Sequence, residues 1–191
     1  MAKIINAKKK FFGTDGIRGP ISSKTSPDFI LKLGWAAGEV FKDLGIKTFI
    51  IGKDTRISGY MLEAALQAGI ISSGLNVRLV GPLPTPAISY LVSTFKSQAG
   101  IVISASHNSY EDNGIKFFDD KGQKISDEIE LLIEQKISEE ITVVEPERLG
   151  KAARLNDASG RYIEYCKNSL SQQISFAGLK IVLDTANGAA Y

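Results

Sequence analysis

The sequence predicts an α/β protein: a mixed, mostly parallel sheet with helices on both faces, followed by the start of a second α/β domain. Short apolar runs rich in β-branched residues alternate along the chain with longer segments of helical apolar spacing. Strands joined by helices of ten or more residues imply right-handed crossovers and parallel pairing. A hairpin pattern near residue 120 adds an antiparallel side to the sheet.

The first predicted helix spans residues 27 to 44. Ser26 suits the N-cap position, Pro27 suits the first turn, and Asp28 complements the positive end of the helix dipole. Gly45 marks the end of the helix. Large apolar side chains recur at helical spacing within it and are expected in the core: Phe29, Trp35 and Phe41.

The strand and helix signals then recur along the first two thirds of the chain. Three compact apolar runs, too short for helices, predict strands at residues 48–51, 77–80 and 100–103. Two segments with helical apolar spacing lie between them, at residues 58–73 and from Pro86 to Phe95. A sheet built from these runs has helices on both faces, because each strand is apolar throughout.

The antiparallel side of the sheet is predicted after residue 114. Residues 115–118, the turn at 119–122 and residues 123–125 have the pattern of a hairpin. Ser126 then suits the N-cap of a helix that runs to about residue 139.

A domain boundary is expected near residue 155. Residues 140–157 are polar and without a clear period, which divides the chain into residues 1–155 and 156–191. The second part predicts a helix at 159–170 and a buried strand at 180–183, after which the sequence soon stops. A buried parallel strand needs neighbours and a covering helix, so the chain is expected to be a fragment with an uncovered apolar edge.

Composition excludes several classes of protein. The 191 residues are 43% hydrophobic and carry a formal charge of +2, which gives no broad cationic footprint for nucleic acid. No run approaches the roughly 20 apolar residues of a membrane helix. The single cysteine, Cys166, cannot form an internal disulfide and favours a reducing compartment, so a cytoplasmic location is expected. The apolar helical context of this thiol indicates packing rather than reactivity.

The segment from Ser104 to Lys116 carries the strongest chemical signal. It follows a buried strand, so it lies at the carboxyl edge of the sheet, where open α/β folds bind ligands. Ser106 is a candidate nucleophile, His107 a proton carrier or phosphate donor, and Lys116 a cation that can neutralise developing charge. A hydrolase triad is the rival interpretation. It is disfavoured because side chains adjacent in an extended segment diverge.

Two further loops supply cations to the same edge. Residues 12–20 place three glycines around Arg18, and residues 52–59 place Lys53 and Arg56 before a helix N-terminus. Together with Lys116 these side chains can hold a phosphate without a Walker loop. Taken singly, several of these residues have a structural interpretation as well: Lys53, Asp54 and Thr85 as framework, Arg56 as a partner of Asp54, and Asp15 as a residue that orients Arg18 or caps a turn.

These motifs together resemble the α-D-phosphohexomutase family. Residues 12–19 are similar to the amino-terminal signature of the family, and residues 103–108 to its phosphoserine loop. Two departures are visible: Ser109 stands where proline is usual, which loosens the loop, and Lys53 stands where arginine is common. Neither change removes a chemical group that the mechanism needs. The other matching segments follow in order, so the resemblance covers the whole chain: 52–56, 85–87, 113–118 and 184–190.

The resemblance implies that Ser106 carries a phosphoryl group and exchanges it with a hexose phosphate. The motif Ser-Ala-Ser-His-Asn favours glucosamine 6-phosphate as the substrate. The resemblance implies glucose or glucosamine 1,6-bisphosphate as activator or intermediate. A homodimer is the assembly considered for the protein. By the same resemblance Arg18 and Lys116 assist proton transfer or stabilise charge, and His107 steadies the loop. The supporting residues that the resemblance implies are Thr14, Asp15, Asn108, Lys53, Asp54 and Arg56.

The resemblance also implies a Mg²⁺ ion bound through the phosphate on Ser106, with aspartate ligands from a loop that this sequence lacks. Family members have four domains, so this chain is expected to contain the first and the start of the second, and not to complete the reaction alone. Two alternatives remain open: a glucose or mannose phosphate mutase of the same family, and a non-catalytic module that binds phosphosugars.

Overall fold

Six strands form one mixed sheet in the computed structural model, which describes residues 9–22, 25–95, 98–171 and 174–191. Their order is β1-β5-β4-β2-β3-β6. The central strands pair in parallel, and β5 is antiparallel to both of its neighbours, which confirms the mixed sheet. The strands are β1 (Ile17–Pro20), β2 (Thr48–Lys53), β3 (Asn76–Pro82), β4 (Gln98–Ile103), β5 (Asp112–Phe118) and β6 (Ala152–Arg154).

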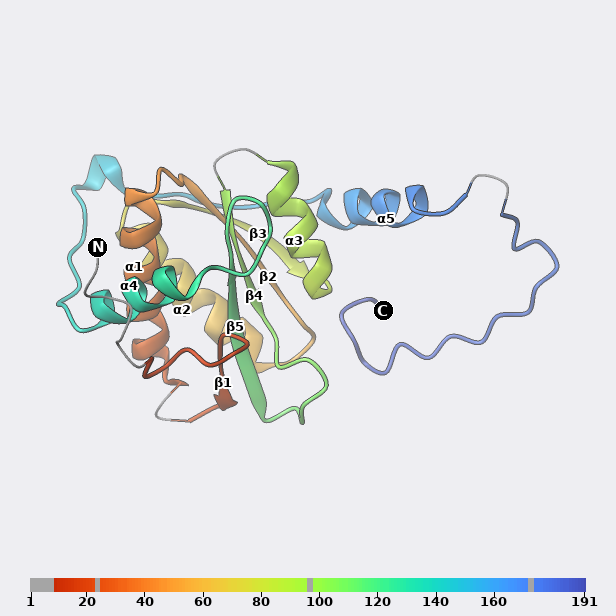
Figure 1. The fold of residues 1–191 in the computed structure, drawn as a ribbon, viewed down its shortest axis with the longest axis horizontal. Helices are drawn as coiled ribbons and strands as arrows, with labels where there is room; N and C mark the ends of the chain where they lie inside the picture. The colour runs from red at the N-terminus through yellow and green to blue at the C-terminus, as the bar shows by residue number, and fades with distance from the viewer. Residues whose placement is uncertain (1–8, 23–24, 96–97, 172–173) are drawn as a thin grey trace.

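Helices cover both faces of the sheet (Figure 1). Three of them pack on one face, and α3 packs on the other together with the start of α5. The helices are α1 (Pro27–Asp43), α2 (Ser58–Ser72), α3 (Thr85–Thr94), α4 (Asp127–Ile137) and α5 (Ala158–Asn168), with a short 3₁₀ turn at Pro146–Arg148. The predicted helices are confirmed, with ends that shift by one or two residues.

The two faces of the sheet explain the continuous apolar runs. Successive side chains of a strand point to opposite faces, so Phe49 and Ile51 pack among α1, α2 and α4, while Ile50 packs against α3. On β5 the same alternation places Ile115 and Phe117 on the first face. Lys116 lies between them and therefore faces the α3 side of the sheet.

The predicted caps of two helices are formed. Ser26 accepts a hydrogen bond from the backbone N–H of Phe29, and Ser126 accepts one from that of Ile129. Each cap satisfies a donor that the first helical turn leaves free. Trp35 and Phe41 are buried, as expected for core residues of α1.

Two strands are absent from the sequence prediction. Residues 17–20 were expected in a glycine-rich loop but form β1, because they pair with β5 at the sheet edge in spite of a composition that is poor for strands. β6 lies in the segment that showed no period. The second arm of the predicted hairpin, residues 123–125, is reduced to one bridge between Phe118 and Lys124.

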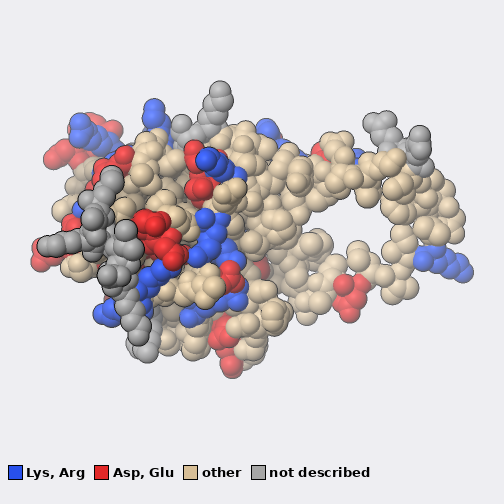
Figure 2. Space-filling view, in the orientation of Figure 1, with Lys and Arg blue, Asp and Glu red and all other residues tan. Residues whose placement is uncertain are grey.

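The expected strand at 180–183 is wrong for the described chain. Residues 169–171 and 174–191 form no helix or strand, and Val182 is 99% exposed. A strand exists through its pairing, and no described strand lies beside this segment. The expectation of an uncovered apolar segment there is confirmed, because Ile181 and Leu183 are exposed as well. Figure 2 shows this C-terminal part as a largely uncharged extension beside a body of mixed charge.

Cys166 corrects a second expectation about this region. It was expected to pack inside, but it lies on α5 with its thiol side chain exposed. α5 contacts the body through Ala158 and Tyr162 and through the stacking of Tyr165 on Tyr90 of α3, and Cys166 is not among these contacts. The domain boundary near residue 155 stays a prediction, and residues 1–8 lie outside the described part.

No helix in the described part of the chain has both the length and the apolar character needed to cross a membrane.

Candidate active site

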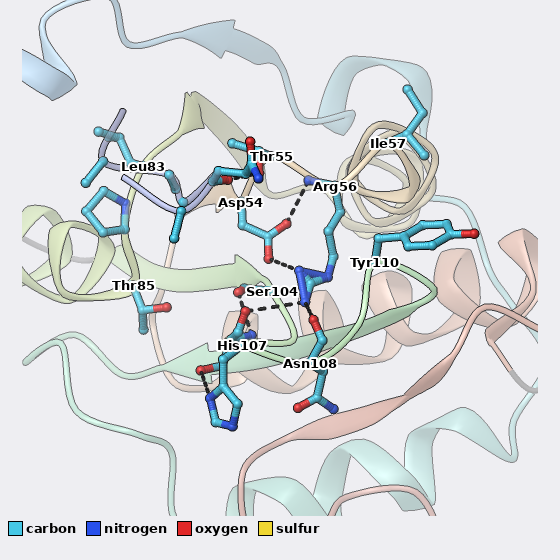
Figure 3. A pocket seen from close by; sticks show the side chains of 17 residues that line it. Asp54, Thr55, Arg56, Ile57, Leu83, Thr85, Ser104, His107, Asn108 and Tyr110 are labelled. Carbon is cyan, nitrogen blue, oxygen red and sulfur yellow. Dashed lines mark hydrogen bonds and ion pairs between the residues drawn. The ribbon is translucent and has the colours of Figure 1, made fainter. Parts of the chain in front are cut away.

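The site lies where β2 and β4 end side by side. The two strands are parallel and Lys53 is in register with Ile103, so the loops that follow them leave the sheet at the same edge. The backbone N–H of Asp54 donates to the carbonyl of Ile103 over 2.9 Å, which joins the two loops directly after the strands. The Asp54–Ile57 loop therefore lies against the loop of Ser106 (Figure 3).

Ser106 is presented by a sharp turn of the backbone. Ala105 before it is fully buried and anchors the loop, whereas Ser106 is exposed. The φ angle of Ser106 is 58°, in the left-handed region that non-glycine residues rarely adopt. Its backbone N–H donates to the Ser104 hydroxyl oxygen over 3.0 Å. This combination is typical of a functional residue held against its local preference.

The expected divergence of Ser106 and His107 is wrong. The Ser106 Oγ lies 3.3 Å from the His107 Nδ1, because the left-handed turn brings together two side chains that an extended backbone would separate. Within the described chain no carboxylate contacts His107, so the third member of a hydrolase triad is missing there. The pair can exchange a proton between hydroxyl and imidazole, which a phosphoryl-accepting serine also needs.

Arg18 and Lys116 share one carboxylate. Asp15 forms ion pairs with both cations, from β1 and β5 respectively. Of the two interpretations of Asp15, the structure supports the one in which it orients Arg18. Its hydrogen bond with Lys116 and the positive charges of Lys116 and Arg18 lower the pKa of Asp15. Asp15 is thus the counter-ion of these two cations.

The turn before β1 requires a glycine. Gly16 has a φ of +83°, and a Cβ placed on it would lie 2.3 Å from the carbonyl oxygen of Ile115. The close backbone approach brings Asp15 next to Lys116 across the strand pair. This accounts for one of the three glycines that the sequence places around Arg18.

Two hollows meet at Ser106. The smaller one has a volume of about 260 Å³ and contains both cations; it is lined by Asp15, Arg18, Thr85, Val102, Ser104, Ser106 and Lys116. The larger one, of about 710 Å³, lies between the Asp54–Ile57 loop, the loop of Ser106 and residues 186–190 of the C-terminal segment. Thr85, Ser104 and Ser106 line both. A phosphoryl group on Ser106 would thus have cations on one side and open space for a ligand on the other.

The C-terminal segment returns to the body at the larger hollow. The Thr55 hydroxyl donates to the carbonyl of Asn187 over 2.6 Å. No strand connects the segment to the sheet, so this bond and the lining contacts place it.

Arg56 faces the loop backbone. Figure 3 shows its side chain extending between Asp54 and the loop that carries His107 and Asn108. The guanidinium donates to the carbonyl oxygens of Ser106 and Asn108 in that loop, to the carbonyl of Asp112 at the start of β5, and to the Asp54 carboxylate. The sequence analysis gave pairing with Asp54 as the structural interpretation of Arg56. This ion pair is present, with 3.2 Å between the Arg56 Nη1 and the Asp54 Oδ2.

Lys53 lies away from the two hollows. Its side chain is 3% exposed, forms an ion pair with Glu63 of α2, and has its ammonium 4.4 Å from the centre of the Tyr60 ring. The structure thus supports the framework interpretation of Lys53. The direction of a side chain at a strand end depends on which face is packed, so the sequence gives no signal for it.

The remaining expected residues lie near the site with different roles. The Asn108 amide donates to the Asp112 carboxylate over 2.9 Å and braces the loop. Thr14 is exposed in the turn before β1. Ser104 was not singled out by the sequence analysis, although it borders both hollows and accepts from the Ser106 N–H. Its position directly after a buried strand is the signal that could have identified it.

The described residues do not fit a Mg²⁺ site on their own. Mg²⁺ is bound through carboxylates and other oxygens in octahedral geometry. No group of three or more His, Cys, Asp or Glu side chains gathers around one point in the parts of the chain that the structure describes.

Comparisons with known proteins identify the family. Residues 9–143 match the family described as phosphoglucomutase/phosphomannomutase, alpha/beta/alpha domain I. The chain is 58% identical over 186 residues to a phosphoglucosamine mutase of Aliivibrio fischeri, covering 97% of this chain and 42% of that protein. It is 60% identical over 184 residues to a phosphoglucosamine mutase of Pseudomonas fluorescens, covering 96% and 41%. The chain thus spans about two fifths of the length of these relatives.

Solved structures agree with the fold. The crystal structure of a putative phosphomannomutase from Thermus thermophilus aligns with a TM-score of 0.74 at 30% identity, covering 86% of this chain and 37% of that one. A phosphoglucomutase/phosphomannomutase family protein from Burkholderia thailandensis shares the fold, with a TM-score of 0.71 at 23% identity and coverage of 86% and 36%. With the match over residues 9–143, and with relatives at 58% and 60% identity over nearly all of this chain, the chain belongs to the phosphoglucomutase/phosphomannomutase family.

Proposed function

We propose that this chain carries the phosphoryl-transferring serine of a phosphoglucosamine mutase. The observation that supports this most is the placement of Ser106: exposed, on a left-handed turn, in a hollow that it shares with Arg18 and Lys116. Relatives at 58% and 60% identity are named phosphoglucosamine mutase, which favours glucosamine phosphates as the substrates.

The proposed reaction has two transfers. Phosphorylated Ser106 gives its phosphoryl group to the 1-hydroxyl of glucosamine 6-phosphate, and the serine oxygen regains a proton. The resulting 1,6-bisphosphate turns over, and its 6-phosphoryl group passes to Ser106 with loss of the serine proton, which releases glucosamine 1-phosphate. Each transfer needs mainly alignment and charge neutralisation.

The side chains around Ser106 divide these tasks. Arg18 and Lys116 neutralise the oxygens of the transferred group. The His107 imidazole lies 3.3 Å from the hydroxyl and can hold its proton when the serine is unphosphorylated. Asp15 pairs with both cations in the free protein, so an incoming phosphate competes with this carboxylate for them.

The rest of the assignment follows the family resemblance. We propose a hexosamine phosphate as substrate, a glucose or glucosamine 1,6-bisphosphate as activator, Mg²⁺ as cofactor with further carboxylate ligands, and the cytoplasm as location. We also propose residues 1–155 as a first domain and residues 156–191 as the start of a second. The proposed pathway role is the supply of an amino-sugar 1-phosphate for cell-wall precursors.

A mutase for glucose or mannose phosphates is the second candidate. It is favoured by the description of the matched family and by the structural likeness to a putative phosphomannomutase at 30% identity. Both candidates need the same phosphoserine, so the choice of sugar separates them. A coupled assay with the 6-phosphates of glucosamine, glucose and mannose distinguishes the two.

Mass mapping of phosphate tests the shared step. The chain is incubated with glucose 1,6-bisphosphate, digested, and mapped for phosphopeptides. We expect phosphate on Ser106, none in Ser106→Ala, and retained labelling in Ser109→Ala, which removes an exposed hydroxyl of the same loop as a control. Equal labelling of Ser106→Ala and the unchanged protein would contradict the assignment and would leave a non-catalytic phosphosugar-binding module as the better description.

A further inference from the structure

The loop that carries Ser106 is held in a conformation that its own residues do not favour. Ser106 has a φ of 58°, and its loop runs from Ser104 to Glu111 between β4 and β5. Within the loop the backbone bonds are short and local, such as the N–H of Asn108 to the carbonyl of Ala105 at 3.2 Å, while the Ile21 N–H donates to the carbonyl of Glu111 at the far end of the loop over 3.1 Å. A left-handed serine persists only where surrounding contacts determine it.

Arg56 provides those contacts from outside the loop. Its Nη2 donates to the carbonyls of Ser106 and Asn108, at 3.3 and 2.6 Å. Its Nε donates to the carbonyl of Asp112, at 2.8 Å, where β5 begins. A guanidinium has five N–H donors in a rigid plane, and three of them thus hold two points of this loop and the first residue of β5.

The Asp54 carboxylate holds Arg56 in turn. One oxygen accepts the backbone N–H of Arg56 over 3.0 Å, and the other accepts from its Nη1 over 3.2 Å. Asp54 itself is joined to the end of β4 through its own N–H. A second link lies nearby, because the buried Asn113 donates to the Ser58 hydroxyl over 2.8 Å. The β2–α2 segment is thereby fixed to both ends of the Ser106 loop.

We propose that Arg56 is a positioning residue that latches the Ser106 loop in its left-handed conformation. The contacts assign its guanidinium to loop carbonyls, whereas the sequence pattern grouped Arg56 with the cations that bind phosphate. The cations of the smaller hollow are Arg18 and Lys116. Arg56 borders the larger hollow instead, with its guanidinium N–H groups bonded to three backbone carbonyls and to the Asp54 carboxylate. The consequence for phosphoryl transfer rests on the proposed function; the latch itself does not.

Hydrogen exchange of single backbone amides tests the latch in this chain. The variants are Arg56→Lys, which keeps the charge and loses the planar fork, and Arg56→Gln. Arg78→Lys, at an exposed arginine of β3, is the matched control. We expect the amides of Ser106 and Asn108 to exchange at least about tenfold faster in both Arg56 variants. The amides of Ser104 and Asp54, which bond at the strand ends, should change less than about twofold.

Two results would overturn the latch. Unchanged exchange at Ser106 and Asn108 would show that the loop holds itself. An equal increase in the exchange rate of every amide would show that Arg56 acts only on the global stability of the protein. Should Arg56→Gln fail to fold, the milder Arg56→Lys decides between these outcomes.

The rate of Ser106 phosphorylation by glucose 1,6-bisphosphate gives a second readout. A positioning residue predicts a maximal rate at least about tenfold lower in Arg56→Lys, with a half-saturating concentration within about twofold of the unchanged protein. An unchanged maximal rate with a raised half-saturating concentration would make Arg56 a phosphate-binding cation and refute the proposal. If the unchanged protein takes up no phosphate, the proposed function fails, and the exchange experiment still decides the latch.

Discussion

Removal of the Asp15 carboxylate should make the site bind anions more tightly. In the free protein Asp15 pairs with both Arg18 and Lys116, and the three side chains line the hollow at Ser106. A phosphate that enters this hollow must displace the carboxylate from at least one of the cations. Asp15→Asn removes the competing charge and leaves the size of the side chain almost unchanged.

The expected gain follows from the exposure of the pairs. The Asp15 side chain is 45% exposed, so solvent screens both ion pairs. Exposed pairs contribute about 0.2–1 kcal/mol each. Two of them give about 0.4–2 kcal/mol, which corresponds to a roughly 2- to 30-fold lower dissociation constant for inorganic phosphate.

Calorimetric or NMR titration with inorganic phosphate at low ionic strength measures this gain. The control is Asp120→Asn, which changes the net charge equally at an exposed turn after β5. Equal affinities of Asp15→Asn and Asp120→Asn for phosphate would refute the competition between Asp15 and the ligand.

Three further predictions concern stability. Gly69→Ala should lower the free energy of unfolding by about 1–3 kcal/mol in urea, because a Cβ there would lie 2.0 Å from the Leu31 carbonyl oxygen of α1; Gly160→Ala, with open space around it, should not. Glu63→Gln should cost about 3–5 kcal/mol, since it leaves the buried charge of Lys53 without its carboxylate; a loss below about 1 kcal/mol would refute this. The lowered pKa of Asp15 means that its ion pairs stabilise the fold above its ordinary pKa of about 3.9 and are lost as the pH falls through the lowered value; Asp15→Asn should flatten the pH dependence of unfolding in that acid range.

Much of the fold follows from local signals in the sequence. The cap at Ser26, the apolar runs of the central strands and the helices between them are each determined by near neighbours along the chain. The location of the site is predictable for the same reason, since parallel strands end at a common edge. The family resemblance in residues 12–19 and 103–108 added Ser106 as the candidate for the phosphoryl-carrying serine.

The parts that the sequence does not predict depend on tertiary contacts. β1 is a strand because β5 lies beside it, and residues 180–183 are not a strand because no described strand does. The Lys53 side chain points into the protein because it forms an ion pair with Glu63 on the neighbouring helix α2. The approach of His107 to Ser106 depends on a single φ angle, which residue type alone does not reveal.

The central claim is that Ser106 both receives and passes on a phosphoryl group. A single transfer tests it directly, because one transfer needs the serine and its neighbouring cations and not the turnover of the bisphosphate. The chain is phosphorylated with glucose 1,6-bisphosphate, freed of small molecules and mixed with glucosamine 6-phosphate, and ³¹P NMR follows the phosphorus. We predict that the phosphoserine signal falls as the signal of a sugar 1-phosphate group of the bisphosphate rises. A phosphoserine that stays on the protein, or that yields only inorganic phosphate, would contradict the account.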